Sequence, residues 1–290
     1  MAVLDALIEP AADAEAAPRR RRLSYVFWAA AVWIAIVIAA ALLADFLPIP
    51  SPTEMDMLAR RMAPGAQHWL GTDGLGRDML SRIVFGARTS LTVGFVAPAI
   101  GLALGAGLGM LAGYFRGKFE ALAMAGTDVL LAFPPLVLIL AITAYLGQSV
   151  LNLAVTIGFL SIPPFARVAR AATLTLAQRE FVTAARALGA SHARILVREL
   201  LPNVALPLLA FFLLAVAVTI VVEGALSLLG LGVPPPTSSW GSMIGEGRES
   251  LDVAPWLAFL PAGVMFLTVL SFNLVGDTLR AITDPRENAL

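Results

Sequence analysis

Long uncharged apolar runs dominate the pattern of residues along this chain. They cover residues 23–44, 89–115, 129–166, 200–222 and 253–275. Because an apolar α-helix needs about 20 residues to cross about 30 Å of hydrocarbon, each run predicts at least one membrane-spanning helix. The run at 129–166 is too long for a single crossing, and Gly147, Gln148 and Ser149 predict a turn within it. The pattern therefore predicts an all-α membrane protein with six transmembrane helices.

The composition agrees with a membrane protein and excludes several kinds of site. The 290 residues have a mean hydropathy of +0.83, and only 14% of them are charged. The absence of cysteine removes thiol catalysis, disulfides and thiolate metal sites. A net charge of zero argues against a nucleic-acid partner. His68 and His192 are expected on opposite sides of the membrane, so no metal site is predicted.

The basic residues predict how the chain is oriented. Arg19–Arg22 precede an apolar run that is longer than the apolar region of a signal peptide, so we interpret the run as an uncleaved anchor. With the N-terminus inside, the inner segments hold most of the Lys and Arg residues, as cytoplasmic segments do. We expect a multi-pass membrane protein with both termini in the cytoplasm.

The runs divide the chain into a tail, a first span, an external segment and a core. Residues 1–22 are expected to form a cytoplasmic N-terminal tail, 23–48 the first transmembrane helix, 49–88 an external segment, 89–286 the core with five transmembrane helices, and 287–290 a C-terminal tail. Within the external segment, Met79, Leu80, Ile83, Val84 and Phe85 recur at helical spacing. This amphipathic piece predicts a helix that lies at the membrane surface.

The second span carries a glycine every four residues, at Gly101, Gly105, Gly109 and Gly113. Small residues on one helix face allow another backbone to approach closely. The stripe indicates helix packing, either within this chain or against a partner subunit. The segment 113–119 that follows does not have the spacing of a phosphate-binding loop, so the chain is expected to carry no ATP site of its own.

Glu223 is the only acid placed deep in a span, about 20 residues into the run that continues to Leu231. A carboxyl group at that depth is costly unless it faces protein or water. We therefore expect Glu223 to face inward, where it either lines a substrate path or forms a hydrogen bond between helices.

The segment 180–203, EFVTAARALGASHARILVRELLPN, predicts a helix, a break and a second helix between two spans. Phe181, Ala184, Ala185 and Leu188 recur on one face, and Gly189 has the position of a helix-ending glycine. Ser191 is expected to cap the second helix and Pro202 to close it before the next span. The small alanine surface fits insertion into a groove of another protein; an amphipathic helix at the lipid interface is the alternative.

Five blocks of the sequence resemble one family. They are TAARALGA followed by LLPN, HWLGTDGLGRDMLSRIVFGARTSL at 68–91, DVLLAFP at 128–134, LSLLGLGVPPPTSSWG at 226–241 and FNLVGDTLRAITDPR at 272–286. Together they resemble the C-type permease subunit of the dipeptide, oligopeptide and nickel branch of ABC importers. The resemblance covers residues 66–286.

This resemblance implies a type I ABC importer permease architecture, a location in the bacterial cytoplasmic (inner) membrane and a set of partners. A second permease, two ATPase subunits and an external binding protein would complete the transporter, and the loop at about 171–202 would carry the cytoplasmic coupling helix. The coupling residues would be Glu180, Thr183, Ala184, Ala185, Leu188 and Gly189. Thr183 departs from the glutamate usual in the family, which puts in question a charge-assisted bond from this position to the ATPase.

The cargo implied by the family is a short peptide, with nickel chelates, glutathione or another small solute as alternatives. ATP and Mg are expected in the partner ATPase subunits, so the chain itself would bind no cofactor and would not be an enzyme. An ion-coupled carrier is the remote alternative, although it would need more acids within the spans. An intramembrane enzyme is not favoured, because the spans hold no cysteine, no histidine and no pair of acids.

Overall fold

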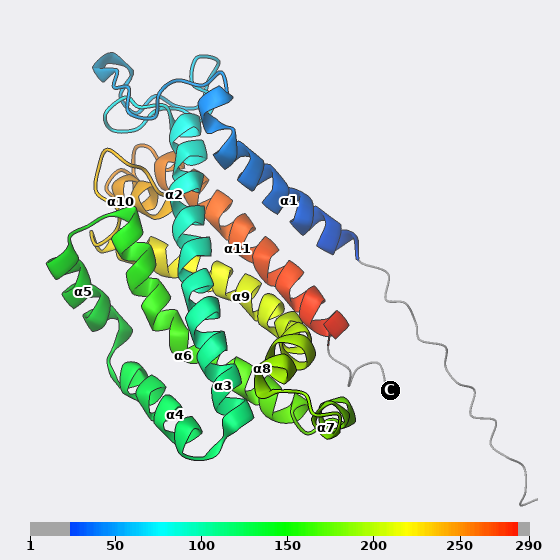
Figure 1. The fold of residues 1–290 in the computed structure, drawn as a ribbon. Helices are drawn as coiled ribbons and strands as arrows, with labels where there is room; N and C mark the ends of the chain where they lie inside the picture. Colours follow the sequence, from blue (N-terminus) through cyan, green and yellow to red (C-terminus); the bar gives the residue numbers. More distant parts are fainter. Residues whose placement is uncertain (1–23, 284–290) are drawn as a thin grey trace, which may run out of the picture.

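The computed structural model describes residues 24–283, and helices make up most of this part of the chain. Its longer helices are α1 (Tyr25–Leu42), α2 (Met79–Ile100), α3 (Gly107–Phe115), α4 (Gly117–Ala132), α5 (Pro135–Leu146), α6 (Val150–Leu176), α9 (Leu201–Leu228) and α11 (Trp256–Thr283) (Figure 1). The helices that lie outside the candidate spans or begin one are α7 (Glu180–Ala187), α8 (His192–Arg194) and α10 (Trp240–Arg248). The all-α fold is confirmed. The tails expected at 1–22 and 287–290 lie outside the described residues.

Five helical stretches are long and apolar enough to cross a membrane. They are Tyr25–Leu42, Met79–Phe115, Val150–Leu176, His192–Leu228 and Trp256–Ile282. A sixth crossing exists if α4 and α5 are counted together as one broken span. The described part of the chain thus accommodates the six predicted spans, one of which is not a continuous helix.

The second span begins ten residues earlier than its uncharged run, at Met79. The Asp78 carboxylate accepts the Ser81 N–H at 2.8 Å and caps the helix there. The prediction of a separate surface helix over 79–88 is therefore wrong, because this piece is the first part of α2. Ser81 and Arg82 of this piece are buried in the bundle.

A π-helical turn at Gly101–Ala106 joins α2 to α3, and there the glycine stripe lies against α6. A Cβ added at Gly101 would lie 2.7 Å from the Ser161 side chain, and one at Gly113 would lie 2.8 Å from the Arg170 carbonyl oxygen. At Gly105 and Gly109 the α6 backbone is closer still. The close approach of the two backbones requires these positions to lack side chains, and α6 of the same chain occupies the face.

Replacing Gly109 with alanine should destabilise the protein by about 1–3 kcal/mol, the usual range for overpacking a tight contact. The added Cβ would collide with the backbone of Ala166, which cannot move aside as a flexible side chain could. Gly107 is the matched control, because it lies on the same helix with open space around it. We expect thermal unfolding in detergent to show Gly107→Ala unchanged or slightly stabilised, and equal midpoints for the two variants would contradict the packing argument.

The third span is bent by 83° between α4 and α5. Phe133 has an extended backbone, as residues before proline prefer, and the proline at 134 cannot continue the hydrogen-bond ladder of α4. The sequence pattern, which starts a continuous helix at Val129, is wrong in this respect. The turn predicted at Gly147–Ser149 is confirmed, because α5 ends at Leu146 and α6 begins at Val150.

Pro202 does not close a helix before the fifth span, contrary to the prediction. The helix runs without a break from His192 to Leu228. The six residues before Leu201 form a π-helical turn, Ile195–Leu200, which loosens the backbone where proline would otherwise clash with a carbonyl of the preceding turn. The predicted cap is confirmed, since the Ser191 hydroxyl accepts the Arg194 N–H at 3.3 Å.

Helix α9 is the central element of the bundle. It contacts α2, α6, α10 and α11, while α1 packs against α2 and α11 on one side (Figure 1). Val216 and Ile220 of α9 share one buried cluster with Leu91 of α2, Trp240 of α10 and Phe272 of α11. This arrangement places α10 and the segment 43–78 at one end of the bundle and α7 near the other (Figure 1).

Candidate functional site

Helix α7 lies at one end of the bundle and is attached to it by a single buried side chain. Val182 is fully buried in a cluster with Tyr114 of α3 and with Ile195 and Leu200 of the helix that follows. Ala185 packs against the same cluster. Val182 is not among the residues predicted from the sequence, although its position one turn before Ala185 was the available signal. The helix is thus held rigidly on one face and is free on the other.

The C-terminus of α7 has the geometry that the glycine predicted. Gly189 has φ of +76°, its N–H bonds the Arg186 carbonyl at 2.9 Å, and the Ala190 N–H bonds the Ala185 carbonyl at 3.0 Å. This pair of bonds is a Schellman closure, which favours glycine because other L-residues rarely adopt positive φ. The chain can therefore leave α7 at a fixed angle and enter α8 directly.

The free face of α7 contains most of the expected coupling residues. Glu180, Thr183, Ala184, Leu188 and Gly189 are exposed, and Ala185 is half-buried. The sequence grouped Phe181, Ala184, Ala185 and Leu188 on one face, but the structure divides them, because Ala185 faces the bundle. Leu188 is 88% exposed, so this chain leaves an apolar side chain uncovered beside a small alanine surface.

Tyr114 of α3 contacts both α7 and α8. The Arg186 guanidinium lies 5.3 Å from the centre of the Tyr114 ring, and the Tyr114 hydroxyl lies 2.8 Å from His192 Nδ1. Thr183 lines a cavity of about 280 Å³ with Arg116 and Arg186. A displacement of α7 would be transmitted to α3 and to the start of the long helix through these contacts.

Glu223 is fully buried and lies between α9 and α2. Its two carboxyl oxygens accept hydrogen bonds from the hydroxyls of Ser227 at 2.8 Å and Ser90 at 3.1 Å. Ser90 in turn accepts the Trp240 N–H at 3.2 Å, which brings the start of α10 into the cluster. Glu223 faces inward as expected, and its hydrogen bonds connect α2, α9 and α10.

Replacing Glu223 with glutamine should lower the free energy of unfolding by about 1 kcal/mol and impair transport. Both carboxyl oxygens accept from serines, whereas an amide nitrogen donates and would leave one hydroxyl without a buried acceptor. Asp277→Asn is the control, because Asp277 is an exposed acid near the end of α11. Thermal unfolding and uptake should separate the two variants, and a Glu223→Gln protein equal to wild type in both assays would make the buried carboxyl group incidental.

An ion-pair network joins the external segment to α2 and α10. Arg82 is 2% exposed and bonds both Asp73 and Glu246, and Arg77 bonds the same two acids at 2.6 and 2.9 Å. Burial raises the pKa of Asp73, but the backbone N–H of Arg77 and the Arg82 charge lower it more, so the net pKa lies below its ordinary value. Ionised Asp73 therefore stabilises the folded protein, and this stabilisation is complete when the pH is above the ordinary pKa of an aspartate. It is lost as the pH falls through the lower pKa that Asp73 has in the folded state.

This network was not predicted from the sequence, although three of its members lie in the block at 68–91. The available signal was the clustering of Asp73, Arg77 and Arg82 at spacings of four and five residues. Their partner Glu246 is 164 residues away from Arg82 in the chain, so only the folded arrangement brings the four charges together.

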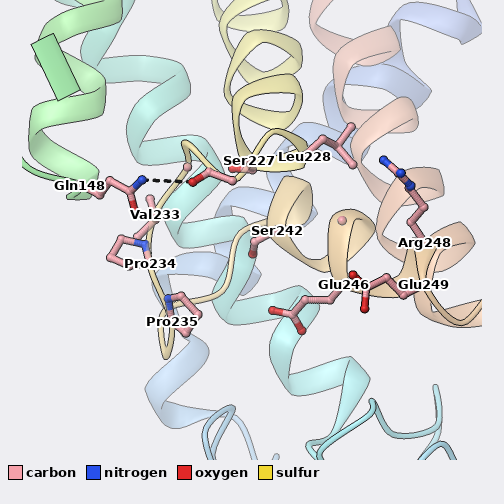
Figure 2. Close-up of a pocket in the computed structure, with 13 residues that line it drawn as sticks. Gln148, Ser227, Leu228, Val233, Pro234, Pro235, Ser242, Glu246, Arg248 and Glu249 are labelled. Carbon is pink, nitrogen blue, oxygen red and sulfur yellow. Dashed lines mark hydrogen bonds between the residues drawn. The ribbon is translucent and has the colours of Figure 1, made fainter. Parts of the chain in front are cut away.

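A cavity of about 480 Å³ lies beside this network at the α10 end of the bundle. Figure 2 shows its wall, which is formed by the end of α9, the loop through Val233–Pro235, one face of α10 and Gln148 from the α5–α6 turn. The Gln148 amide donates to the Gly230 carbonyl at 3.1 Å. Glu246, Arg248 and Glu249 place charged groups on the rim of the cavity.

Comparison with known proteins gives the family. The family model described as "Binding-protein-dependent transport system inner membrane component" matches residues 105–288. The glutathione transport system permease protein GsiD of Pectobacterium atrosepticum is 39% identical over 269 residues, which cover 92% of this chain and 89% of that protein. GsiD of Escherichia coli O6:H1 is 41% identical over the same shares.

A solved structure shares the fold. A chain of the MetNI methionine ABC transporter in an inward-facing conformation superimposes with a TM-score of 0.58 at 20% identity, over 71% of this chain and 98% of that chain. The family match covers more than half of the chain and the relatives extend over almost all of it. The chain therefore belongs to the binding-protein-dependent transport system inner membrane components and is a permease subunit of an ABC importer.

Proposed function

We propose that this permease pairs with a second, homologous permease to form the translocation path for short peptides, glutathione included. Two ATPase subunits bind at the α7 end, and a binding protein delivers cargo at the α10 end. ATP and Mg are bound by the ATPase subunits, so this chain contributes the path and the mechanical link and no catalytic group. The transporter as a whole is an ATP-driven translocase.

The uncovered face of α7 is the observation that supports the coupling role. A short helix held by Val182 and closed at Gly189 presents Ala184 and an exposed Leu188 away from its own bundle. A groove on an ATPase subunit would cover this face. Movement of that groove would push on α7, and the contacts to Tyr114 and Ile195 would carry the displacement into two spans as a rigid-body change.

The distribution of charge supports the orientation. Arg116, Arg170, Arg186 and Arg194 all belong to segments around the α7 end, which gives that end the excess of basic residues that cytoplasmic segments carry. The α10 end, with its buried ion-pair network, then faces outward. Both termini are cytoplasmic in this orientation.

The relatives support the class of cargo. GsiD proteins are named for glutathione transport, and glutathione is a small peptide with a free ammonium group and free carboxylates. Short peptides and glutathione share these charges, so we propose them as one chemical class. Nickel chelates remain the competing cargo.

Co-purification followed by uptake tests this proposal. The chain would be tagged at its C-terminus, purified from mildly solubilised native membranes and reconstituted into vesicles with the proteins that accompany it. We expect a second permease, ATPase subunits and ATP-dependent uptake of alanyl-alanine or glutathione. A chain that purifies alone would contradict the assembly, and uptake of a nickel chelate but of neither peptide would contradict the cargo.

A further inference from the structure

The cavity at the α10 end has a size and a lining that suit a small charged ligand. Its volume of about 480 Å³ lies within the range of small-molecule sites. The wall is formed by Gly230, Gly232 and the loop 233–235, by the ends of two helices, α9 and α10, and by Gln148 from the α5–α6 turn. A site assembled from elements so distant in sequence is a product of the fold, and neither the family match nor the comparisons assign it a role.

Two opposite charges at this cavity have no partner in the described part of the chain. Arg248 and Glu249 line the cavity and are exposed, and within residues 24–283 neither side chain forms a hydrogen bond or an ion pair. Figure 2 shows them pointing in different directions from the end of α10. Glu246, by contrast, forms ion pairs with Arg77 and Arg82. The cavity therefore offers one free cation and one free anion, which do not neutralise each other.

The wall of the cavity continues into the buried polar cluster of the bundle. Ser227 lines the cavity and donates its hydroxyl hydrogen to Glu223, which also accepts from Ser90 of α2. A purely lipid-facing hollow would have no reason to adjoin buried carboxyl and hydroxyl groups. This continuity connects the cavity to the interior of the membrane-spanning bundle.

We infer that this cavity is a cargo subsite that holds the charged ends of a zwitterionic peptide. Glu249 binds the ammonium group, Arg248 binds the carboxylate, and Glu246 with its two arginines fixes the adjoining wall. The inference rests on the proposed peptide cargo and on the outward orientation of the α10 end. It adds a recognition step on the permease after release from the binding protein.

Binding measured without the binding protein tests the subsite directly. The assembled transporter, purified in lipid nanodiscs, would be dialysed against labelled alanyl-alanine, N-acetyl-alanyl-alanine and alanyl-alanine amide. Glu249→Gln should weaken binding of alanyl-alanine about five- to tenfold while leaving the N-acetyl peptide unchanged, because only the free ammonium group uses the carboxylate. Arg248→Gln should show the converse pattern, with the amide unchanged.

Asp252→Asn is the matched control, because Asp252 is an exposed acid in the next turn that does not line the cavity. It should bind all three peptides as the wild type does. The subsite would be overturned if a variant lost affinity equally for the free and the blocked peptides, or if the wild type showed no saturable binding. It would also be overturned if a variant bound the peptides normally but no longer co-purified with a partner protein. If wild-type vesicles take up neither alanyl-alanine nor glutathione, the proposed cargo itself fails, whereas normal peptide uptake with unchanged variants rejects only the subsite.

Discussion

Replacing Gly189 with proline is expected to reduce ATP-driven uptake to background. Proline fixes φ near −65°, whereas Gly189 has φ of +76°, and proline also lacks the N–H that closes α7 on Arg186. The end of α7 must then open, so that Ala184 and Leu188 lose their fixed position. The variant should still insert and pair with the second permease, because a Cβ added at this position would have no contact within 4 Å. Uptake and ATPase co-purification would be measured together.

A graded series separates the backbone requirement from a side-chain effect. Asparagine tolerates positive φ and alanine does so poorly, so uptake should decrease in the order Gly, Asn, Ala, Pro at position 189. A bulky substitution at the exposed Ala184 should likewise abolish uptake without unfolding the chain, because its own bundle leaves that side chain uncovered. Normal uptake by Gly189→Pro would remove α7 as the coupling helix.

Replacing Arg82 with methionine is expected to lower the free energy of unfolding by about 3 kcal/mol, at the lower end of the cost of breaking a buried ion pair. The change leaves Asp73 buried with one arginine instead of two, and it removes the two hydrogen bonds of Glu246 to Arg82 at 2.8 and 3.1 Å. Glu246 is itself 41% exposed, so water can replace part of that loss. Thermal unfolding in detergent would measure the change.

Arg88 supplies the control for this substitution on the same helix. Its guanidinium pairs with Asp45 at 2.9 Å, but the two side chains are 42% and 62% exposed, and exposed ion pairs contribute about 0–1 kcal/mol. Arg88→Met should therefore unfold close to the wild type. If the two methionine variants unfolded at the same temperature, the network of Asp73, Arg77, Arg82 and Glu246 would not be a stabilising feature of the external end.

Proline and charge explain where the sequence-based account of the helices was wrong. The run at 129–166 contains no charged residue at the break before Pro135, so the apolar pattern alone does not reveal that break. Pro202 predicts the end of a helix, but the helix continues past it because a π-helical turn precedes it. The apolar spacing from Met79 to Phe85 predicted a surface helix because the intervening Arg82 was expected to face water. Its burial depends on Glu246, which no local pattern could provide.

The sequence by itself determined the all-α membrane class, the turn at Gly147–Ser149, the cap at Ser191 and the closure of α7 at Gly189. These features are local: hydrophobic length, side-chain capping and backbone φ depend on neighbouring residues alone. The tertiary structure decided that Val182 anchors α7, that Glu223 joins Ser90 and Ser227, and that the charged network and the cavity form at the α10 end. Their partners come from distant helices, so burial and hydrogen bonding across the bundle had to be known first.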